Sequence, residues 1–178
     1  ALPALSLQTG WPDARNRREG TPARVAHDLL ANGFGPGANG PLLVVADLNG
    51  ADSDAAEEIA ATLADVAGVA QVTPAIVNPA GDAAVLRAVP TTGPQEAETR
   101  QLVDDLRAQT IPALQEATGA TIEVTGATAA YIDLSERMES RLPLFISAVV
   151  LLSFILLTIV FRAPVVALKA AAMNLLGI

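Results

Sequence analysis

The longest apolar run in the chain extends from Leu142 to Phe161, and Arg141 and Arg162 bracket it. Twenty residues without a charge make a helix of about 30 Å, which matches the hydrocarbon thickness of a bilayer. A buried helix of a large soluble core is the alternative, but such helices rarely run this long without one charge. The pattern therefore predicts a transmembrane helix over 142–161, whose hydroxyl groups bond back to carbonyls of the same helix. These hydroxyls belong to Ser147, Ser153 and Thr158.

Shorter apolar patterns precede this run and alternate between strand and helix periodicity. The order is β-α-β-β-α-β, which is the ferredoxin-like plan of an α+β domain, with two helices on one face of a sheet. The other face is left bare, so we expect another domain or subunit to cover it. Strands are predicted at 41–48, 69–73, 83–90 and 121–125, and helices at about 53–67 and from Thr92 to Gly119.

Several residues predict where these helices begin, bend or end. Asp52 or Ser53 should cap the first of the two helices. Thr92 and Gln95 have the spacing of a capping box for the second, and Pro112 should break or kink it. At the entrance to the apolar run, Pro143 should kink or restart the helix, because proline lacks an N–H group.

An additional helix is predicted upstream, from Pro22 to Gly33, with Val25, Leu29 and Leu30 on its apolar side. His27 lies in this helix, and an ordinary polar helix face is the simplest interpretation for a lone histidine. The following segment, GFGPGANGP, has neither the spacing nor the following helix of a phosphate-binding loop. We interpret it as a tight connection, with Phe34 tucked into the core or against a neighbour.

Charge divides the chain into two parts. Residues 1–141 contain nine basic and nineteen acidic side chains, whereas the last 37 residues contain only Arg162 and Lys169. A net negative module with 3% aromatic residues is a poor partner for nucleic acid. The loop that holds Arg15, Arg17 and Arg18 could bind anionic lipid, although a solvated loop is the simpler interpretation because acidic residues dilute its charge.

No pattern indicates catalysis or a bound metal. The chain contains no cysteine and one histidine, so Cys-based disulfide, metal and redox chemistry are excluded. The acidic segment DLNGADSD lacks the glycine and glutamate positions of a calcium loop, and no G-x-S-x-G sequence occurs. We therefore expect no enzyme activity, no metal and no cofactor.

The two ends suggest further membrane sequence. Residues 1–20 are interpreted as a linker from a preceding membrane helix, and 162–178 as a short cytoplasmic turn and the start of another membrane helix. The basic residues of that turn favour the cytoplasm, which places residues 1–141 outside the cell membrane. We expect the chain to be a piece of a longer multi-pass protein.

Four segments together resemble a known family. In order, they are GFGPGANGPLLVV, TTGPQEAETRQLVDDLR, IEVTGATAAYIDLSERMESRLPLFI and IVFRAPVVALKAAAMNLLGI. They are similar to the mycobacterial-membrane-protein-large (MMPL) family of the resistance-nodulation-division (RND) superfamily of transporters. The resemblance implies a bacterial plasma-membrane protein in which 21–141 form the second extracytoplasmic porter domain.

The resemblance also implies a function, namely export of lipids or other hydrophobic compounds driven by the proton gradient. Proton relay in the family uses acidic residues within membrane helices, and none follows Glu139 here. Expected partners are membrane lipids, a lipidic substrate, the remaining domains of the same chain and a second copy in a homo-oligomer. A membrane-anchored accessory or binding module of an export system is the alternative. Candidate residues for contacts with substrate or neighbouring domains are Phe34, Tyr131, Met138 and Phe145.

Overall fold

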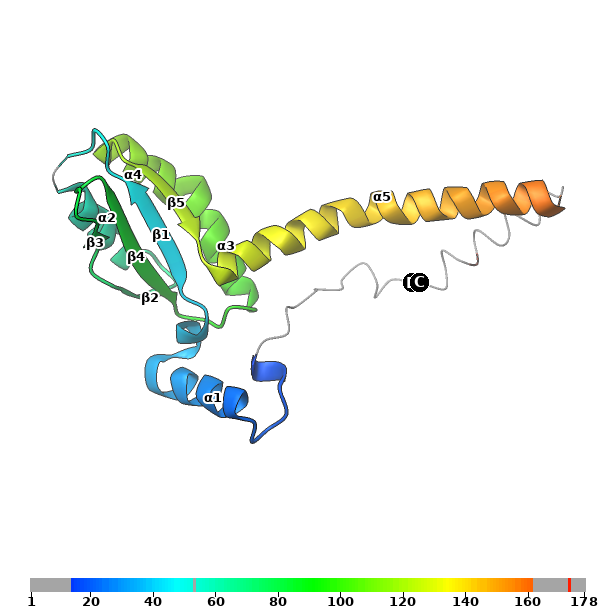
Figure 1. Cartoon of the computed structure of the whole chain (residues 1–178), viewed down its shortest axis with the longest axis horizontal. Helices are drawn as coiled ribbons and strands as arrows, with labels where there is room; N and C mark the ends of the chain where they lie inside the picture. The colour runs from blue at the N-terminus through cyan, green and yellow to red at the C-terminus, as the bar shows by residue number, and fades with distance from the viewer. Residues whose placement is uncertain (1–13, 53, 162–172, 174–178) are drawn as a thin grey trace. The chain divides into compact units, whose positions relative to one another are not determined.

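The computed structural model describes residues 14–52, 54–161 and 173, and its centre is one antiparallel β-sheet (Figure 1). The strands lie side by side in the order β2-β4-β1-β5, and the short β3 also pairs with β4. The predicted strands are confirmed to within one or two residues. Their bounds are β1 Leu42–Asp47, β2 Val69–Val72, β3 Ile76–Val77, β4 Ala83–Pro90 and β5 Thr121–Thr125.

The register places alternate residues of the three longest strands on a common buried face. Val44 of β1 lies opposite Leu86 of β4 on one side and Val124 of β5 on the other. Because successive side chains of a strand point to opposite faces, this register carries the pattern along the whole sheet. The strand residues of the core are Leu42, Val44, Ala46, Ala84, Leu86, Ala88, Ile122 and Val124.

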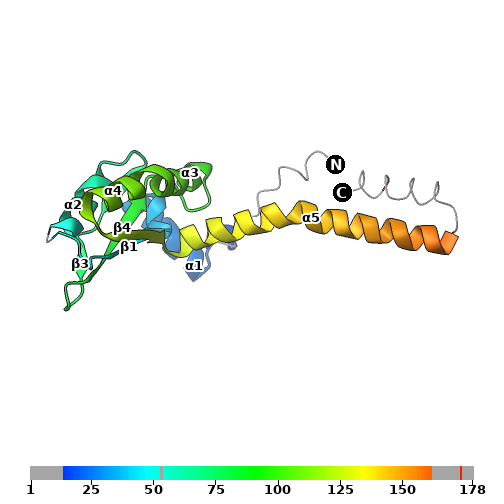
Figure 2. The same ribbon diagram turned by 90° about the horizontal axis from the view of Figure 1, so that it is seen from above.

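Two helical segments cover the buried face (Figure 2). Helix α2, Ala55–Ala64, contributes Ile59 and Leu63 to the core. The second segment is α3, Ala97–Asp105, which continues through the π-helical turn η4, Leu106–Thr110, into α4, Ile111–Thr118. Gly119 then ends α4 in the left-handed conformation with a φ of 71°. The prediction of two helices on one face is confirmed.

The opposite face of the sheet is exposed in this structure. Val45 and Val85 face each other across β1 and β4, and each keeps more than a third of its surface accessible. Arg87 is exposed on the same face, because successive residues of β4 alternate between the two faces of the sheet. The predicted bare face is therefore confirmed, and its expected cover by another domain stays a prediction.

The structure differs from the predicted starts of both helices. The residue that precedes α2 is Asp54 and not Asp52, and its side chain makes no capping hydrogen bond; Ser53, the other predicted cap, lies outside the described residues. The Thr92 capping box does not form, because α3 begins at Ala97 and the Thr92 hydroxyl lies 2.7 Å from the hydroxyl of Thr99. The Thr92 hydroxyl, which the local pattern assigned to a helix cap, thus contacts the buried Thr99 instead.

Pro112 lies near the start of α4, and the chain remains helical on both sides of it. Immediately before it, the backbone N–H of Ile111 donates to the carbonyl of Leu106, five residues earlier. A π-turn of this kind absorbs the irregularity that proline imposes on a regular α-helix. Pro112 therefore coincides with a local π-turn and does not break the helix.

The N-terminal part of this unit contains short η2, Ala14–Asn16, helix α1, Pro22–Phe34, and short η3, Pro36–Asn39. Helix α1 contacts η2 and η3, and it lies beyond the end of the sheet instead of on its face (Figure 1). The tight connection predicted after α1 is confirmed. A Cβ atom at Gly37 would lie 1.8 Å from the carbonyl oxygen of Pro90, so this contact requires glycine.

The last described element is α5, one continuous helix from Ala127 to Phe161. Pro143 lies inside it, so the predicted restart of the helix at this residue does not occur. The chain divides into two compact units, and the boundary falls within α5 between Ile132 and Asp133. The first unit is the core module, Gly10–Ile132.

Candidate functional site

The start of α5 is the candidate functional site, because here the core module leads directly into the apolar helix. One residue, Gly126, separates the last residue of β5 from the first residue of α5. Its φ of 103° is unfavourable for other residues, and a Cβ atom there would lie 3.1 Å from the backbone nitrogen of Leu43. Glycine thus allows the chain to turn from strand to helix against the neighbouring strand β1.

A buried hydrogen bond fixes the first turn of α5. The hydroxyl of Thr128 donates to the carbonyl oxygen of Gly40 at 2.9 Å, and Thr128 is almost completely buried. A Cβ atom at Gly40 would lie 2.5 Å from this hydroxyl and 2.4 Å from Cβ of Pro94. Glycine at position 40 therefore lets three segments distant in the sequence pack closely together.

Two residues of the first turns of α5 belong to the hydrophobic core. Ala129 and Ile132 are buried among the core side chains of the sheet and helices. Burial of an isoleucine stabilises a fold by about 1.5–3 kcal/mol. The first turns of α5 are therefore an integral part of the core module and not a flexible tether.

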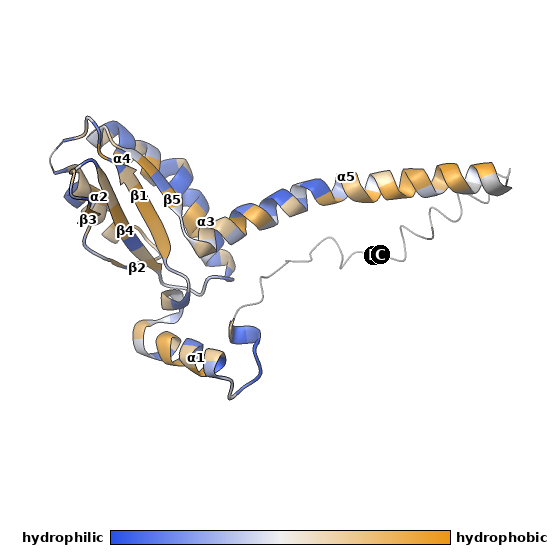
Figure 3. Ribbon diagram, viewed as in Figure 1, coloured by the Kyte–Doolittle hydropathy of each residue, from blue (hydrophilic) through white to orange (hydrophobic). Residues whose placement is uncertain are grey.

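Beyond the core module, α5 has the length and composition of a membrane-spanning helix. Among the described residues, Ala127–Leu156 is a helical stretch long and apolar enough to cross a membrane; its first turns lie in the core module, and its most apolar part is not buried. Figure 3 shows the change from a mixed first half to a predominantly apolar second half. The hydroxyls of Ser147 and Thr158 donate to the carbonyls of Pro143 and Phe154, as the sequence predicted.

The four candidate contact residues are all exposed. Phe34, at the end of α1, is 75% exposed, so it is not part of the core. Tyr131 is 36% exposed and lies in the core module, within the first turns of α5. Met138 and Phe145 lie seven residues apart in the second unit, which places them on one side of α5. Their exposure leaves them available for contacts, and their role stays a prediction.

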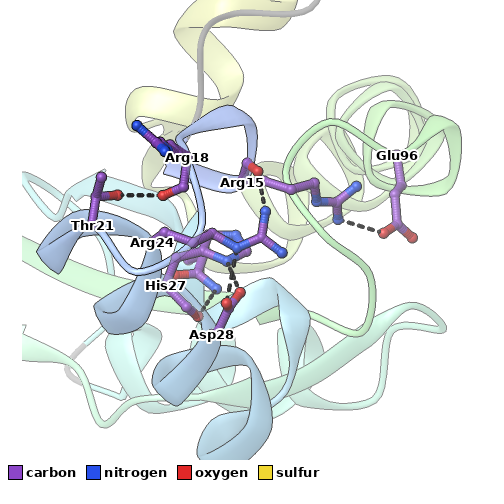
Figure 4. Close-up of polar contacts among 8 residues, drawn as sticks. Arg15, Arg18, Thr21, Arg24, His27, Asp28 and Glu96 are labelled. Atoms are coloured by element: carbon purple, nitrogen blue, oxygen red, sulfur yellow. Dashed lines mark hydrogen bonds and ion pairs between the residues drawn. The ribbon is translucent and has the colours of Figure 1, made fainter.

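His27 is placed differently from the prediction, since it is buried with 8% exposure and does not lie on a solvated face. Its Nδ1 lies 3.2 Å from a carboxylate oxygen of Asp28, and its backbone carbonyl accepts a hydrogen bond from Asn39 (Figure 4). Within the described ranges, no group of three or more metal-binding side chains occurs. The backbone of His27 thus links α1 to η3 through the hydrogen bond from Asn39.

Asp28 and Arg24 complete the polar contacts of this side of α1. Arg24 donates to Asp28 at 2.8 Å and also to the backbone carbonyl of Arg15. The hydrogen bond from Arg24, followed by the contact with His27, holds the pKa of the Asp28 carboxyl below its ordinary value. Arg15 in turn forms an ion pair with Glu96, at the N-terminal end of α3, at 3.1 Å (Figure 4). The polar side of α1 thus contacts η2 and η3, and η2 in turn is paired with the start of α3.

This inward polar side was not predicted. The sequence pattern identified Val25, Leu29 and Leu30 as the apolar side of α1, but these side chains are exposed in the structure. The available signal was the recurrence of Arg24, His27, Asp28 and Ala31 at helical spacing, which is as regular as the apolar pattern.

A family model and several known proteins match almost the entire chain. The sequence model of the MMPL family matches residues 26–173. Membrane protein YdfJ of Bacillus subtilis is 42% identical over 97% of the chain. The mycolic acid-containing lipids exporter MmpL11 of Mycolicibacterium smegmatis is 30% identical over 100% of the chain. The heme uptake protein MmpL11 of Mycobacterium tuberculosis is 28% identical over the same share.

The matched regions are only parts of these relatives. The chain spans 24% of the length of YdfJ and 19% of the length of the MmpL11 proteins. Each comparison therefore concerns the core module and the helix that follows it.

Proposed function

The chain belongs to the MMPL family, and we propose that it forms the second extracytoplasmic porter domain and an adjoining membrane helix of a multi-pass transporter. In this proposal, residues 1–20 link the domain to a preceding membrane helix and 21–141 form the porter domain. Residues 142–161 cross the bacterial plasma membrane, and 162–178 form a cytoplasmic turn and begin the next membrane helix. The protein is a transporter and not an enzyme.

The start of α5 is the observation that carries this proposal. The buried Thr128 and Ile132 fix the first turns of α5 in the core module, and the same helix continues without interruption to Phe161. A rearrangement of the porter domain would therefore displace the base of this helix directly. A flexible anchor would not need a helix that begins inside the core of its domain.

The strand order supports a ferredoxin-like porter domain. In β2-β4-β1-β5, the first and last long strands are neighbours, and each helical segment connects one central strand to one edge strand. This is the arrangement that two interleaved β-α-β units produce. The exposed face around Val45 and Val85 is then available for packing against another domain of the same transporter.

The proposed substrate is a lipid or another hydrophobic compound, and the proposed energy source is the proton gradient. The names of the relatives support a hydrophobic substrate, since one is an exporter of mycolic acid-containing lipids and another takes up heme. The chain holds no acidic residue after Glu139, so the proposed proton-relay residues lie outside it. Phe34, Tyr131, Met138 and Phe145 are proposed to contact substrate or neighbouring domains.

Cysteine labelling tests the proposed topology. The chain has no cysteine, so Ala80→Cys, in the exposed turn before β4, introduces a unique thiol. A membrane-impermeant maleimide added to intact cells should label Ala80→Cys and leave Arg162→Cys unlabelled until the cells are opened. Labelling only after lysis at position 80 would contradict an extracytoplasmic porter domain.

A transport assay tests the function. The complete transporter in proteoliposomes should move a fluorescent lipid only when a pH gradient is imposed, and a protonophore should abolish the movement. Lipid binding without gradient-dependent movement would instead support the accessory binding module.

A further inference from the structure

The apolar side of helix α1 is exposed. Leu29 is 67% exposed and Phe34 is 75% exposed, although both are large apolar residues within a 13-residue helix. Val25 and Leu30 are also exposed, and the only buried residue of α1 is His27. The usual arrangement of an amphipathic helix on a soluble core is thus reversed.

The exposed side chains cover a continuous half of the helix. At about 100° per residue, Val25, Leu29, Leu30 and Phe34 fan over about 180°. The remaining positions within this half are filled by small or apolar residues and carry no charge. They are Pro22, Ala23, Ala26 and Gly33. We call this half of α1 the outer face.

The polar contacts on the other side prevent α1 from turning over to bury its outer face. Rotation would break the hydrogen bond from Arg24 to the backbone carbonyl of Arg15 and the hydrogen bond from Asn39 to the backbone carbonyl of His27. Both hydrogen bonds are partly buried, so leaving the carbonyls of Arg15 and His27 without these donors would cost about 1–3 kcal/mol for each. The outer face therefore stays exposed until something outside the core module covers it.

We propose that α1 is an interfacial helix whose outer face inserts into the surface of an anionic lipid bilayer. Helices with one apolar half lie in the plane of the interface, with the apolar half at the boundary of headgroups and acyl chains. Arg17 and Arg18 are exposed in the loop that leads into α1 and contact the lipid phosphates.

The distribution of charge favours an anionic partner at residues 14–34 and not at the rest of the core module. Residues 14–34 hold four arginines against Glu19 and Asp28, whereas residues 35–141 hold five basic and sixteen acidic side chains. An anionic surface therefore attracts the beginning of α1 and repels residues 35–141.

Size and tethering argue for lipid over a second copy of the chain. A 13-residue helix is about 20 Å long, so its outer face offers roughly 300 Å², far below the ~800 Å² per partner of a stable protein interface. A bilayer needs no matching surface, and the apolar part of α5 keeps the chain at the membrane at high effective concentration.

Site-directed spin labelling in bilayers tests this placement independently of any transport activity. The single substitutions Leu29→Cys and Phe34→Cys carry the label in the otherwise cysteine-free chain, and Gln101→Cys, at an exposed position of α3, is the matched control. The chain is reconstituted in vesicles of phosphatidylcholine with phosphatidylglycerol. Collisions with oxygen, which concentrates in lipid, should exceed those with a water-soluble nickel chelate several-fold more at positions 29 and 34 than at 101.

Two results would overturn the proposal. Equal accessibility at positions 29, 34 and 101 would show that the outer face is in water. Broadening of the spectrum that disappears on dilution with unlabelled chain would show that a second copy covers the face. Circular dichroism of each labelled chain establishes that the fold is intact.

The contribution of charge is tested separately. Double substitution of Arg17→Gln and Arg18→Gln, or vesicles of phosphatidylcholine alone, should lower the lipid accessibility of the label at Leu29. Unchanged accessibility in both cases would overturn the requirement for anionic lipid.

Discussion

The side-chain oxygen of Gln115 accepts a hydrogen bond of 2.8 Å from the backbone N–H of Ile122 in the edge strand β5. Nearby, Arg107 donates to the carbonyl of Val124 in the same strand at 3.0 Å. An edge strand with free backbone groups is a template for pairing with another chain. Side chains of α4 and η4 thus occupy backbone groups through which β5 would otherwise recruit a further strand.

Replacing Gln115 by Leu should lower the free energy of unfolding by about 1–2 kcal/mol, because the Ile122 N–H then lacks its partner. Chemical denaturation of the core module in the intact chain, followed by circular dichroism, measures the change. Gln115→Glu is the control, since it keeps an oxygen acceptor at the same place. Equal losses in both variants would show that the hydrogen bond is not the cause.

Two glycine-to-alanine substitutions should have opposite effects. Gly40→Ala should destabilise the core module by about 1–3 kcal/mol, because the new methyl group collides with Pro94 and Thr128. Gly33→Ala should stabilise it by about 0.5–1 kcal/mol, since Gly33 is helical and has no atom within 4 Å of the added group. Thermal unfolding of the two variants side by side checks both signs.

Thr99→Val should cost about 1–3 kcal/mol of stability at nearly constant side-chain volume. Thr99 is completely buried, and its hydroxyl donates to the carbonyl of Gly93 at 2.8 Å, where valine offers no hydrogen bond. Thr99→Ser keeps the hydroxyl and should be the milder substitution in the same denaturation experiment. A larger loss for serine would mean that methyl packing dominates at this position.

The stabilising contribution of Asp28 should depend on pH. Because its pKa is lowered in the folded state, the unfolded state binds the proton more tightly, so the contribution is present above the unfolded pKa. It is lost as the pH falls through the lowered, folded-state pKa. The difference in unfolding free energy between wild type and Asp28→Asn should therefore shrink on acidification. In an Arg24→Gln background this pH dependence should be weaker, because the largest cause of the lowered pKa is then removed.

The sheet could be predicted from the sequence because alternation of buried and exposed residues is a local property of each strand. Val44, Leu86 and Val124 are apolar, and their neighbours along the strand fall on the other face. Gly119 and Gly126 marked the ends of β5, and both have positive φ. The order of elements then restricted the topology to few arrangements.

The orientation of α1 could not be predicted in this way. Periodicity distinguishes two sides of a helix, but it does not say which of them meets the core. Here contacts with distant residues decide the orientation, since Asn39 bonds to His27 and Glu96 pairs with Arg15. The contact between the hydroxyls of Thr92 and Thr99 likewise does not follow from local periodicity, and it is evident only in the folded chain.

The π-turn before Pro112 determines how the fold responds to the deletion of one codon. Five of the buried residues of this helical segment are separated by four, five, three and four positions, and the interval of five spans η4. They are Leu102, Leu106, Ile111, Leu114 and Thr118. A three-nucleotide deletion that removes Gln109 would reduce the interval of five to four and restore an even stripe. It would also place the ring of Pro112 against the carbonyl of the residue that then lies four positions before it. The shortened gene should therefore yield a stable product only when Pro112→Ala accompanies the deletion.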